Sequence, residues 1–145
     1  MRRIAVGSDH AAIRLRRALV AHLVGRGFTV VEVGPDEGDK SDYPDQARTV
    51  AEAVVRGEVD RGVLCCGTGI GVSIAANKVD GIRAALVHDP ITAKLAAQHN
   101  DANVLCLGGR LVASEYGAEL VDAWLDTPFE ARHQARLDLI TALEG

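Results

Sequence analysis

The chain has 145 residues, enough for a single domain with its own core, and 48% of them are apolar. Sixteen basic and twenty acidic residues give a net charge of −4, which argues against a protein that binds nucleic acid or a membrane surface. No apolar run approaches the ~20 residues of a membrane-spanning helix, and Asp9 and His10 interrupt any signal-peptide core, so we expect a cytoplasmic protein.

Short β-branched runs alternate with helical patterns along the chain. A strand is expected over 4–7, followed by an amphipathic helix over 11–25 in which Leu15, Leu19 and Leu23 recur at every fourth position. The later predicted elements are, in order, a strand at 28–33, a loop at 34–42, a helix at 44–56, a strand at 62–66, a helix at 70–78, a strand at 82–87, a helix at 90–99, a strand at 104–107 and helices at 113–126 and 131–143.

This alternation predicts parallel strands joined by helical crossovers. We therefore expect an α/β fold: a three-layer α/β/α sandwich with a five-stranded, Rossmann-like parallel sheet, in one domain over 1–145. The strands are nearly continuous apolar runs, as in sheets that are covered on both faces. The last helix has no strand after it and is expected to pack on another subunit. Ligands of such folds lie outside the carboxyl ends of the strands, which here precede 8–10, 34–43, 66–71, 88–89 and 108–110.

The most informative segment is 65–73, Cys-Cys-Gly-Thr-Gly-Ile-Gly-Val-Ser, where a strand ends and a helix begins. Its three alternating glycines let the backbone approach a ligand, and free amides at a helix start attract a phosphate or an oxyanion that develops during a reaction. Two other interpretations stay open. One is a tight turn that needs glycine for packing. The other is a dinucleotide-binding fingerprint with Asp89 as its acidic residue, although its third glycine would fall at Val72.

The three cysteines have neither disulfide nor zinc spacing, and they divide into one chemical candidate and two packing residues. Cys66 lies just before a helix start, where the helix dipole favours a thiolate, so it is a candidate base or nucleophile. Cys65 should point to the other face of the strand because side chains alternate, and Cys106 lies in an apolar run. We expect these two only to pack.

Histidines and arginines supply the remaining candidates. None of the five histidines has a metal-ligand spacing, and the segment 99–101 is typical of a helix C-terminal cap with Asn100 in the left-handed conformation. Arg132 and Arg136 are four residues apart and share a helix face, so with Arg110 they can form a clamp for a phosphate. The alternative is a solvated helix face.

Five segments together resemble the type B ribose-5-phosphate isomerases, a family that also includes the galactose-6-phosphate isomerase subunits. They are Gly-Ser-Asp-His at 7–10, Asp-Tyr-Pro at 42–44, Cys-Gly-Thr-Gly-Ile-Gly with Ile-Ala-Ala-Asn-Lys within 66–78, Gln-His-Asn-Asp at 98–101 and Arg-His-Gln-Ala-Arg at 132–136. The resemblance therefore runs nearly from end to end. One branch of the family has a cysteine at the position of Cys66, and the other has a glutamate at the position of Val72. This chain resembles the cysteine branch.

The resemblance implies a strand order of 2-1-3-5-4 and a homodimer with active sites shared across the interface, and it leaves a tetramer open. It implies Cys66 as the base, His99 as the acid–base that opens the sugar ring, and Thr68 as a hydroxyl that holds the enediolate. The residues implied to contact the sugar are Asp9, His10, Tyr43, Gly67, Gly69, Ile70, Gly71 and Asn100. Those implied to bind the phosphate are Arg110, Arg132 and Arg136. Cys65, where the family usually has an apolar residue, is a departure.

The activity implied by the resemblance is the interconversion of ribose 5-phosphate and ribulose 5-phosphate through a cis-enediolate, with no metal and no organic cofactor. Its implied place is the pentose phosphate pathway. The preferred sugar stays open because members of the family differ in it. One alternative is an isomerase for a tetrose or hexose phosphate. Another, of a different class, is a non-catalytic module that binds a phosphosugar or a nucleotide.

Overall fold

The computed structural model describes all residues, 1–145, and its five strands form one sheet in the order β2-β1-β3-β5-β4. Every pair of neighbouring strands is parallel. The predicted α/β fold and strand order are therefore confirmed. The strands are β1 (Arg3–Ser8), β2 (Thr29–Val33), β3 (Arg61–Cys66), β4 (Ala84–Leu86) and β5 (Val104–Gly108).

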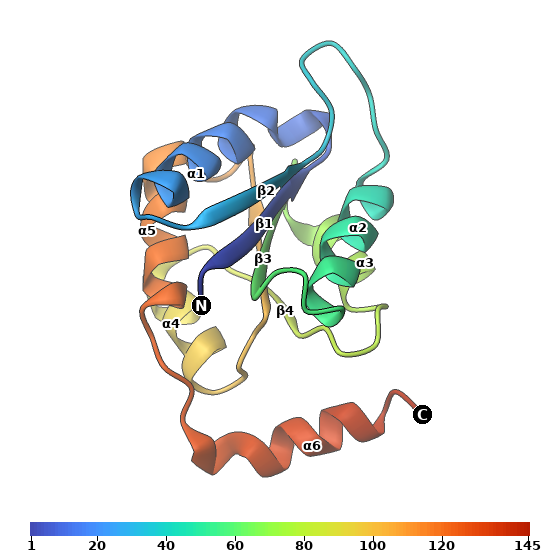
Figure 1. Ribbon diagram of the computed structural model, residues 1–145, viewed down its shortest axis with the longest axis vertical. Helices are drawn as coiled ribbons and strands as arrows, with labels where there is room; N and C mark the ends of the chain where they lie inside the picture. The colour runs from blue at the N-terminus through green and yellow to red at the C-terminus, as the bar shows by residue number, and fades with distance from the viewer.

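Helices cover both faces of the sheet. In Figure 1, α1, α4 and α5 lie on one face and α2 and α3 on the other, whereas α6 crosses below the sheet and belongs to neither layer. None of these helices is both long and apolar enough to cross a membrane. The helices are α1 (Ile13–Gly25), α2 (Tyr43–Val55), α3 (Ile70–Ala76), α4 (Pro90–Gln98), α5 (Ser114–Leu125) and α6 (Gln134–Ala142), and the 3₁₀ turns are η1 (His10–Ala12) and η2 (Ala131–His133).

Two apolar clusters, one on each face of the sheet, form the core. Val63 and Cys65 of β3 belong to the cluster under α1, α4 and α5, and Leu64 and Cys66 belong to the cluster under α2 and α3. This division follows from the alternation of side chains along a strand. The adjacent cysteines therefore lie on opposite faces of the sheet, as predicted.

The edge strands differ from the prediction. β2 lies at one edge of the sheet, as the predicted strand order requires, but its Val31 is 46% exposed, whereas strands covered on both faces were expected. β4 covers only three residues instead of six, partly because the Asn103 side chain accepts a hydrogen bond from the amide of Arg83 at 2.8 Å. A side chain thus takes the place of a strand partner just before β4 begins.

The predicted final helix is divided into η2 and α6, because the chain enters α6 through a 3₁₀ turn, as helices often do. Leu139 and Leu143 of α6 are 69% and 85% exposed, and only Leu137 of this helix is buried. Large apolar side chains of α6 therefore face away from the body of the chain.

Candidate active site

A depression of about 490 Å³ opens at the carboxyl ends of β1 and β3. Its walls come from η1, the start of α2, the turn between β3 and α3, and the turn after β5. The residues that line it are Asp9, His10, Ala11, Tyr43, Cys66, Gly67, Thr68, Ile70, Gly71, Ile74 and Arg110. The fold thus brings together the predicted site residues that follow strands, with Gly69 buried beneath them.

Cys66 ends β3 and is only 4% exposed. Its sulfur accepts a hydrogen bond from the Gly69 amide, with a nitrogen–sulfur distance of 3.2 Å. Gly69 has a φ of +79°, and a Cβ there would lie 2.8 Å from the Leu107 carbonyl carbon, so only glycine fits at this position. The turn therefore aims an amide at the sulfur, where negative charge forms when the thiol gives up its proton.

The other two cysteines have no access to the depression. Cys65 and Cys106 are fully buried, and Cys65 belongs to the cluster on the opposite face of the sheet. Burial raises the pKa of both thiols. Neither is therefore placed to act as a base, in agreement with the expected packing role.

Backbone hydrogen bonds hold the turn after β5 against the turn after β3. The Gly109 amide donates to the Cys66 carbonyl at 2.8 Å, and the Arg110 amide donates to the Gly67 carbonyl at 3.0 Å. The Thr68 hydroxyl oxygen accepts a hydrogen bond from the Ile70 amide at 3.2 Å, so its hydrogen is left to donate to a ligand. Arg110 and the Thr68 hydroxyl thus lie beside Cys66.

Asp9 and His10 are fixed just after β1. An Asp9 carboxylate oxygen accepts a hydrogen bond from the Ala11 amide at 3.0 Å, and the Asp9 amide donates to the Cys65 carbonyl at 3.3 Å. His10 Nδ1 lies 3.0 Å from the Ser41 carbonyl oxygen. Both side chains are therefore held by local contacts at the edge of the depression.

His99, Asn100, Arg132 and Arg136 lie elsewhere, near the junction of α4 with η2 and α6. The rings of His99 and His133 stack with centroids 4.4 Å apart. Burial lowers the pKa of His133, and the nearby charges of Arg132 and His99 lower it further. The exposed Arg132 donates from Nε to Glu130 at 2.6 Å. We call His99, Asn100, Arg132 and Arg136 the amino-end group, because they lie near the amino ends of the strands.

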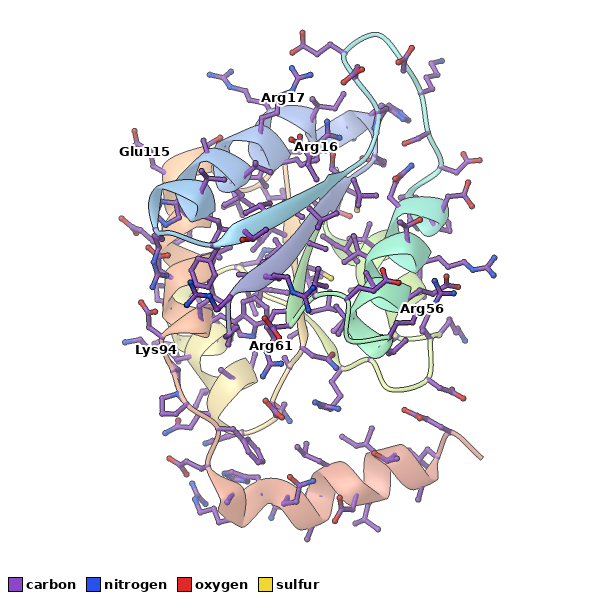
Figure 2. The ribbon with its side chains drawn as sticks, viewed as in Figure 1. Arg16, Arg17, Arg56, Arg61, Lys94 and Glu115 are labelled. Atoms are coloured by element: carbon purple, nitrogen blue, oxygen red, sulfur yellow. The ribbon has the colours of Figure 1, made fainter.

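The depression and the amino-end group lie at opposite ends of the strands, the depression at the carboxyl ends and the amino-end group at the amino ends. Asp101, next to Asn100, pairs at 3.2 Å with Arg61, the first residue of β3, whereas Cys66 is the last residue of that strand. Figure 2 shows Arg61 at the edge of the sheet near α6. A strand of this length separates its ends by about 16 Å. One chain alone therefore does not place His99 beside Cys66.

The same separation bears on the predicted phosphate clamp, because its three arginines do not come together within one chain. Arg110 lines the depression at the carboxyl end, whereas Arg132 and Arg136 flank η2 and α6 at the amino end. The three guanidinium groups converge only if the amino-end group comes from another copy of the chain. The exposed Arg132 and Arg136 are free to meet such a copy.

Two smaller predictions are resolved by backbone geometry. The left-handed residue after α4 is Asp101, with a φ of +44°, so the assignment of that conformation to Asn100 is wrong. Asp101 accepts the conformation because Arg61 and Arg83 hold its carboxylate. The Asp89 carboxylate accepts a hydrogen bond from the Thr92 amide at 2.7 Å and caps α4, which explains it without a nucleotide.

Arg16 is the polar residue that sequence reasoning missed. It lies in the amphipathic helix predicted over 11–25 and was not among the predicted site residues, yet this charged residue is only 2% exposed. A signal was present, since Arg16 precedes Leu19 by three residues and therefore lies on the apolar face.

No three histidine, cysteine or carboxylate side chains in the chain are arranged so that they could hold a metal ion.

Comparison with known proteins adds independent evidence. Residues 4–140 match the family model described as Ribose/Galactose Isomerase. Ribose-5-phosphate isomerase B of Escherichia coli is 50% identical over 99% of this chain and 97% of its own length. A D-erythrulose-4-phosphate isomerase of Pectobacterium atrosepticum is 46% identical over 88% of this chain and 84% of its own.

The solved structure of ribose-5-phosphate isomerase B from Mycoplasma genitalium, with bound ribulose-5-phosphate, superimposes with a TM-score of 0.92. It is 45% identical in sequence and covers 98% of this chain and 95% of its own. The fold, the cysteine at the glycine turn and the match over nearly the full length agree: the chain belongs to the ribose/galactose isomerase family.

Proposed function

We propose that this protein interconverts ribose 5-phosphate and ribulose 5-phosphate. The observation that carries the proposal is Cys66, the one cysteine that lines the depression at the carboxyl ends of β1 and β3, with the Gly69 amide directed at its sulfur. The Escherichia coli relative, named for this activity, is half identical over nearly the whole chain. An aldose–ketose isomerase needs a base beside donors that hold an oxyanion, and this turn supplies both.

In the proposed reaction, the Cys66 thiolate removes the proton from C2 of the open-chain aldose. The electrons of that bond form the C1–C2 double bond, and the C1 oxygen takes the negative charge. The Thr68 hydroxyl and the amides of the glycine turn hold this charge while a proton moves from the C2 oxygen to the C1 oxygen. The Cys66 thiol then returns its proton to C1, and the carbonyl forms at C2. No proton or electron is left over.

Two further steps need the amino-end group of a second copy of the chain. His99 gives a proton to the ring oxygen and takes one from the C1 hydroxyl, so that the bond between C1 and the ring oxygen breaks, the C1 carbonyl forms and the ring opens. Arg132 and Arg136 bind the phosphate together with Arg110, and this remote binding positions C1 and C2 over Cys66. We therefore propose a homodimer whose two active sites each combine both chains. The exposed apolar side chains of α6 support this arrangement because they offer a surface to a second chain.

The test is an isomerisation assay with ribose 5-phosphate beside four- and six-carbon aldose phosphates, in the wild-type protein and in matched Cys66→Ala and Cys65→Ala variants. Wild type and Cys65→Ala should isomerise ribose 5-phosphate fastest, and Cys66→Ala should bind the sugar phosphate without turnover. Equal losses in the two variants would refute the role of Cys66.

The name of the Pectobacterium relative makes a tetrose phosphate the specific rival substrate. Faster turnover of the four-carbon phosphate would replace ribose 5-phosphate and leave the cysteine mechanism standing. Binding of ribose 5-phosphate by the wild-type protein without any isomerisation would instead identify a non-catalytic phosphosugar-binding module.

A further inference from the structure

Arg16 carries a buried charge that the proposed reaction does not use. Its guanidinium is only 2% exposed and donates three hydrogen bonds, each to a different segment. Nε donates to Glu32 of β2 at 2.8 Å, Nη1 to the Ser8 hydroxyl at the end of β1 at 2.9 Å, and Nη2 to the Pro35 carbonyl at 2.7 Å. One side chain of α1 thus ties together the ends of two strands and the loop that follows.

Packing alone does not explain an arginine at this position. A buried charge is costly unless it is paired and hydrogen-bonded, and an apolar side chain would suit the same face of α1 better. Here only Glu32 brings an opposite charge, and it is 39% exposed. The neighbouring Arg17 shows the ordinary alternative, since it points to solvent and makes only long contacts, 3.4–3.8 Å, with Glu37 and Asp36 (Figure 2).

The segments that Arg16 joins carry residues of the proposed site. Ser8 directly precedes Asp9 and His10, and Pro35 begins the 34–42 loop. The other end of that loop reaches back to His10, because the Ser41 carbonyl lies 3.0 Å from Nδ1 of the imidazole. The Ser41 amide also lies 3.3 Å from Nδ1 and can donate a hydrogen bond to it. Ser41 therefore holds the imidazole in either neutral tautomer, and this contact through Nδ1 leaves Nε2 free for a ligand.

The start of the loop is shaped around the guanidinium. Gly34 has a φ of +138°, and any Cβ there would collide with Nη1 of Arg16 and with the Ser8 carbonyl. Between its two ends the loop has a single backbone hydrogen bond of its own, from the Asp39 amide to the Asp36 carbonyl. The position of Ser41 therefore depends on how the two ends are held.

We propose that Arg16 is a positioning residue, which holds the 34–42 loop and the end of β1 so that Ser41 fixes the position and orientation of the His10 ring. The inference rests on the proposed function, in which His10 contacts the sugar phosphate. Arg16 itself touches no substrate.

The test compares Arg16→Met, Arg16→Lys and Arg17→Met in the full-length protein. Two quantities are measured: kcat/KM with ribose 5-phosphate, and the ¹H and ¹⁵N resonances of the His10 ring, which report on how the imidazole is held. We expect Arg16→Met to lower kcat/KM tenfold or more and to shift and broaden the His10 ring resonances. Arg16→Lys should recover much of both, and Arg17→Met should match wild type in both.

A folded Arg16→Met protein with wild-type kcat/KM would overturn the proposal, as would a loss of activity with the His10 ring resonances unchanged. If Arg16→Met does not fold, Ser8→Ala decides, because it removes one acceptor and leaves the arginine in place. Its kcat/KM should fall several-fold with a shift in the His10 resonances, and wild-type values of both would refute the inference. Failure of the proposed function is separate: wild type would then lack isomerase activity, while the His10 ring resonances still report on Arg16.

Discussion

The separation of Cys66 from the amino-end group leads to a prediction about mixed subunits. A base and a ring-opening group must both come within about 3–3.5 Å of atoms of one sugar. Within one chain, Cys66 ends β3, and the amino-end group lies near the start of that strand, about 16 Å away along β3. We therefore expect Cys66→Ala and His99→Asn proteins, each inactive alone, to restore activity when their chains are combined.

The size of the recovery follows from symmetry. Random mixing of equal amounts makes half of the dimers mixed, and a mixed dimer has one site with both residues intact and one site with neither. The mixture should therefore reach about a quarter of the activity of the same amount of wild-type protein. Chains carrying different affinity tags, refolded together, allow the mixed dimer to be purified and assayed directly.

A second mixture provides the control. A chain that carries both substitutions, mixed with an equal amount of wild type, spoils both sites of every mixed dimer if the sites are shared, so only about a quarter of the activity survives. Sites contained within single chains would instead keep about half. Purified mixed dimers of Cys66→Ala and His99→Asn without activity, together with half retention in the control, would refute the shared site.

Three further predictions concern the chemistry and the pH dependence. Prolonged chelation should leave the isomerisation rate unchanged, and a loss that is reversed by a divalent ion would contradict the cysteine mechanism. Arg136→Ala should lower kcat/KM for ribose 5-phosphate by about 10–100-fold, the equivalent of ~1.5–3 kcal/mol, with a much smaller effect on ribose itself; equal losses on both sugars would exclude a phosphate contact. Because burial lowers the pKa of His133 in the folded chain, His133 of the unfolded chain binds its proton at a higher pH. Thermal stability should therefore decline as pH drops below ~6.5, and His133→Gln, followed by its melting temperature from pH 8 to 5, should show a shallower decline.

The sheet could be predicted from the sequence because each strand is a short β-branched run between recognisable helices. What failed depended on tertiary position. The resemblance placed β2 at the edge of the sheet, but nothing in Thr29–Val33 says that Val31 is exposed there. The shortness of β4 depends on Asn103, a side chain twenty residues away from Arg83 in the sequence.

The site was predictable to the extent that it follows strands. Cys66 and Cys65 were assigned to opposite faces from alternation alone, and the two core clusters confirm that assignment. Arg16 was missed because helix periodicity marks a face as buried without saying what a charged residue on it binds. Its acceptors are a carboxylate, a hydroxyl and a carbonyl from three places along the chain, and only the folded chain brings them together.

The polarity of a parallel sheet explains why we propose a site that two chains share. All strands run in one direction, so residues that follow strands gather at the carboxyl ends of the strands. The crossover helices run back in the other direction, so residues at the ends of these helices lie at the amino ends of the strands. Cys66 ends a strand, whereas His99 follows the last residue of α4. A reaction that uses both residues on one sugar must therefore take them from different copies, in which the carboxyl edge of one sheet meets the amino edge of another. The exposed α6, at the amino edge, is the element placed to make that contact.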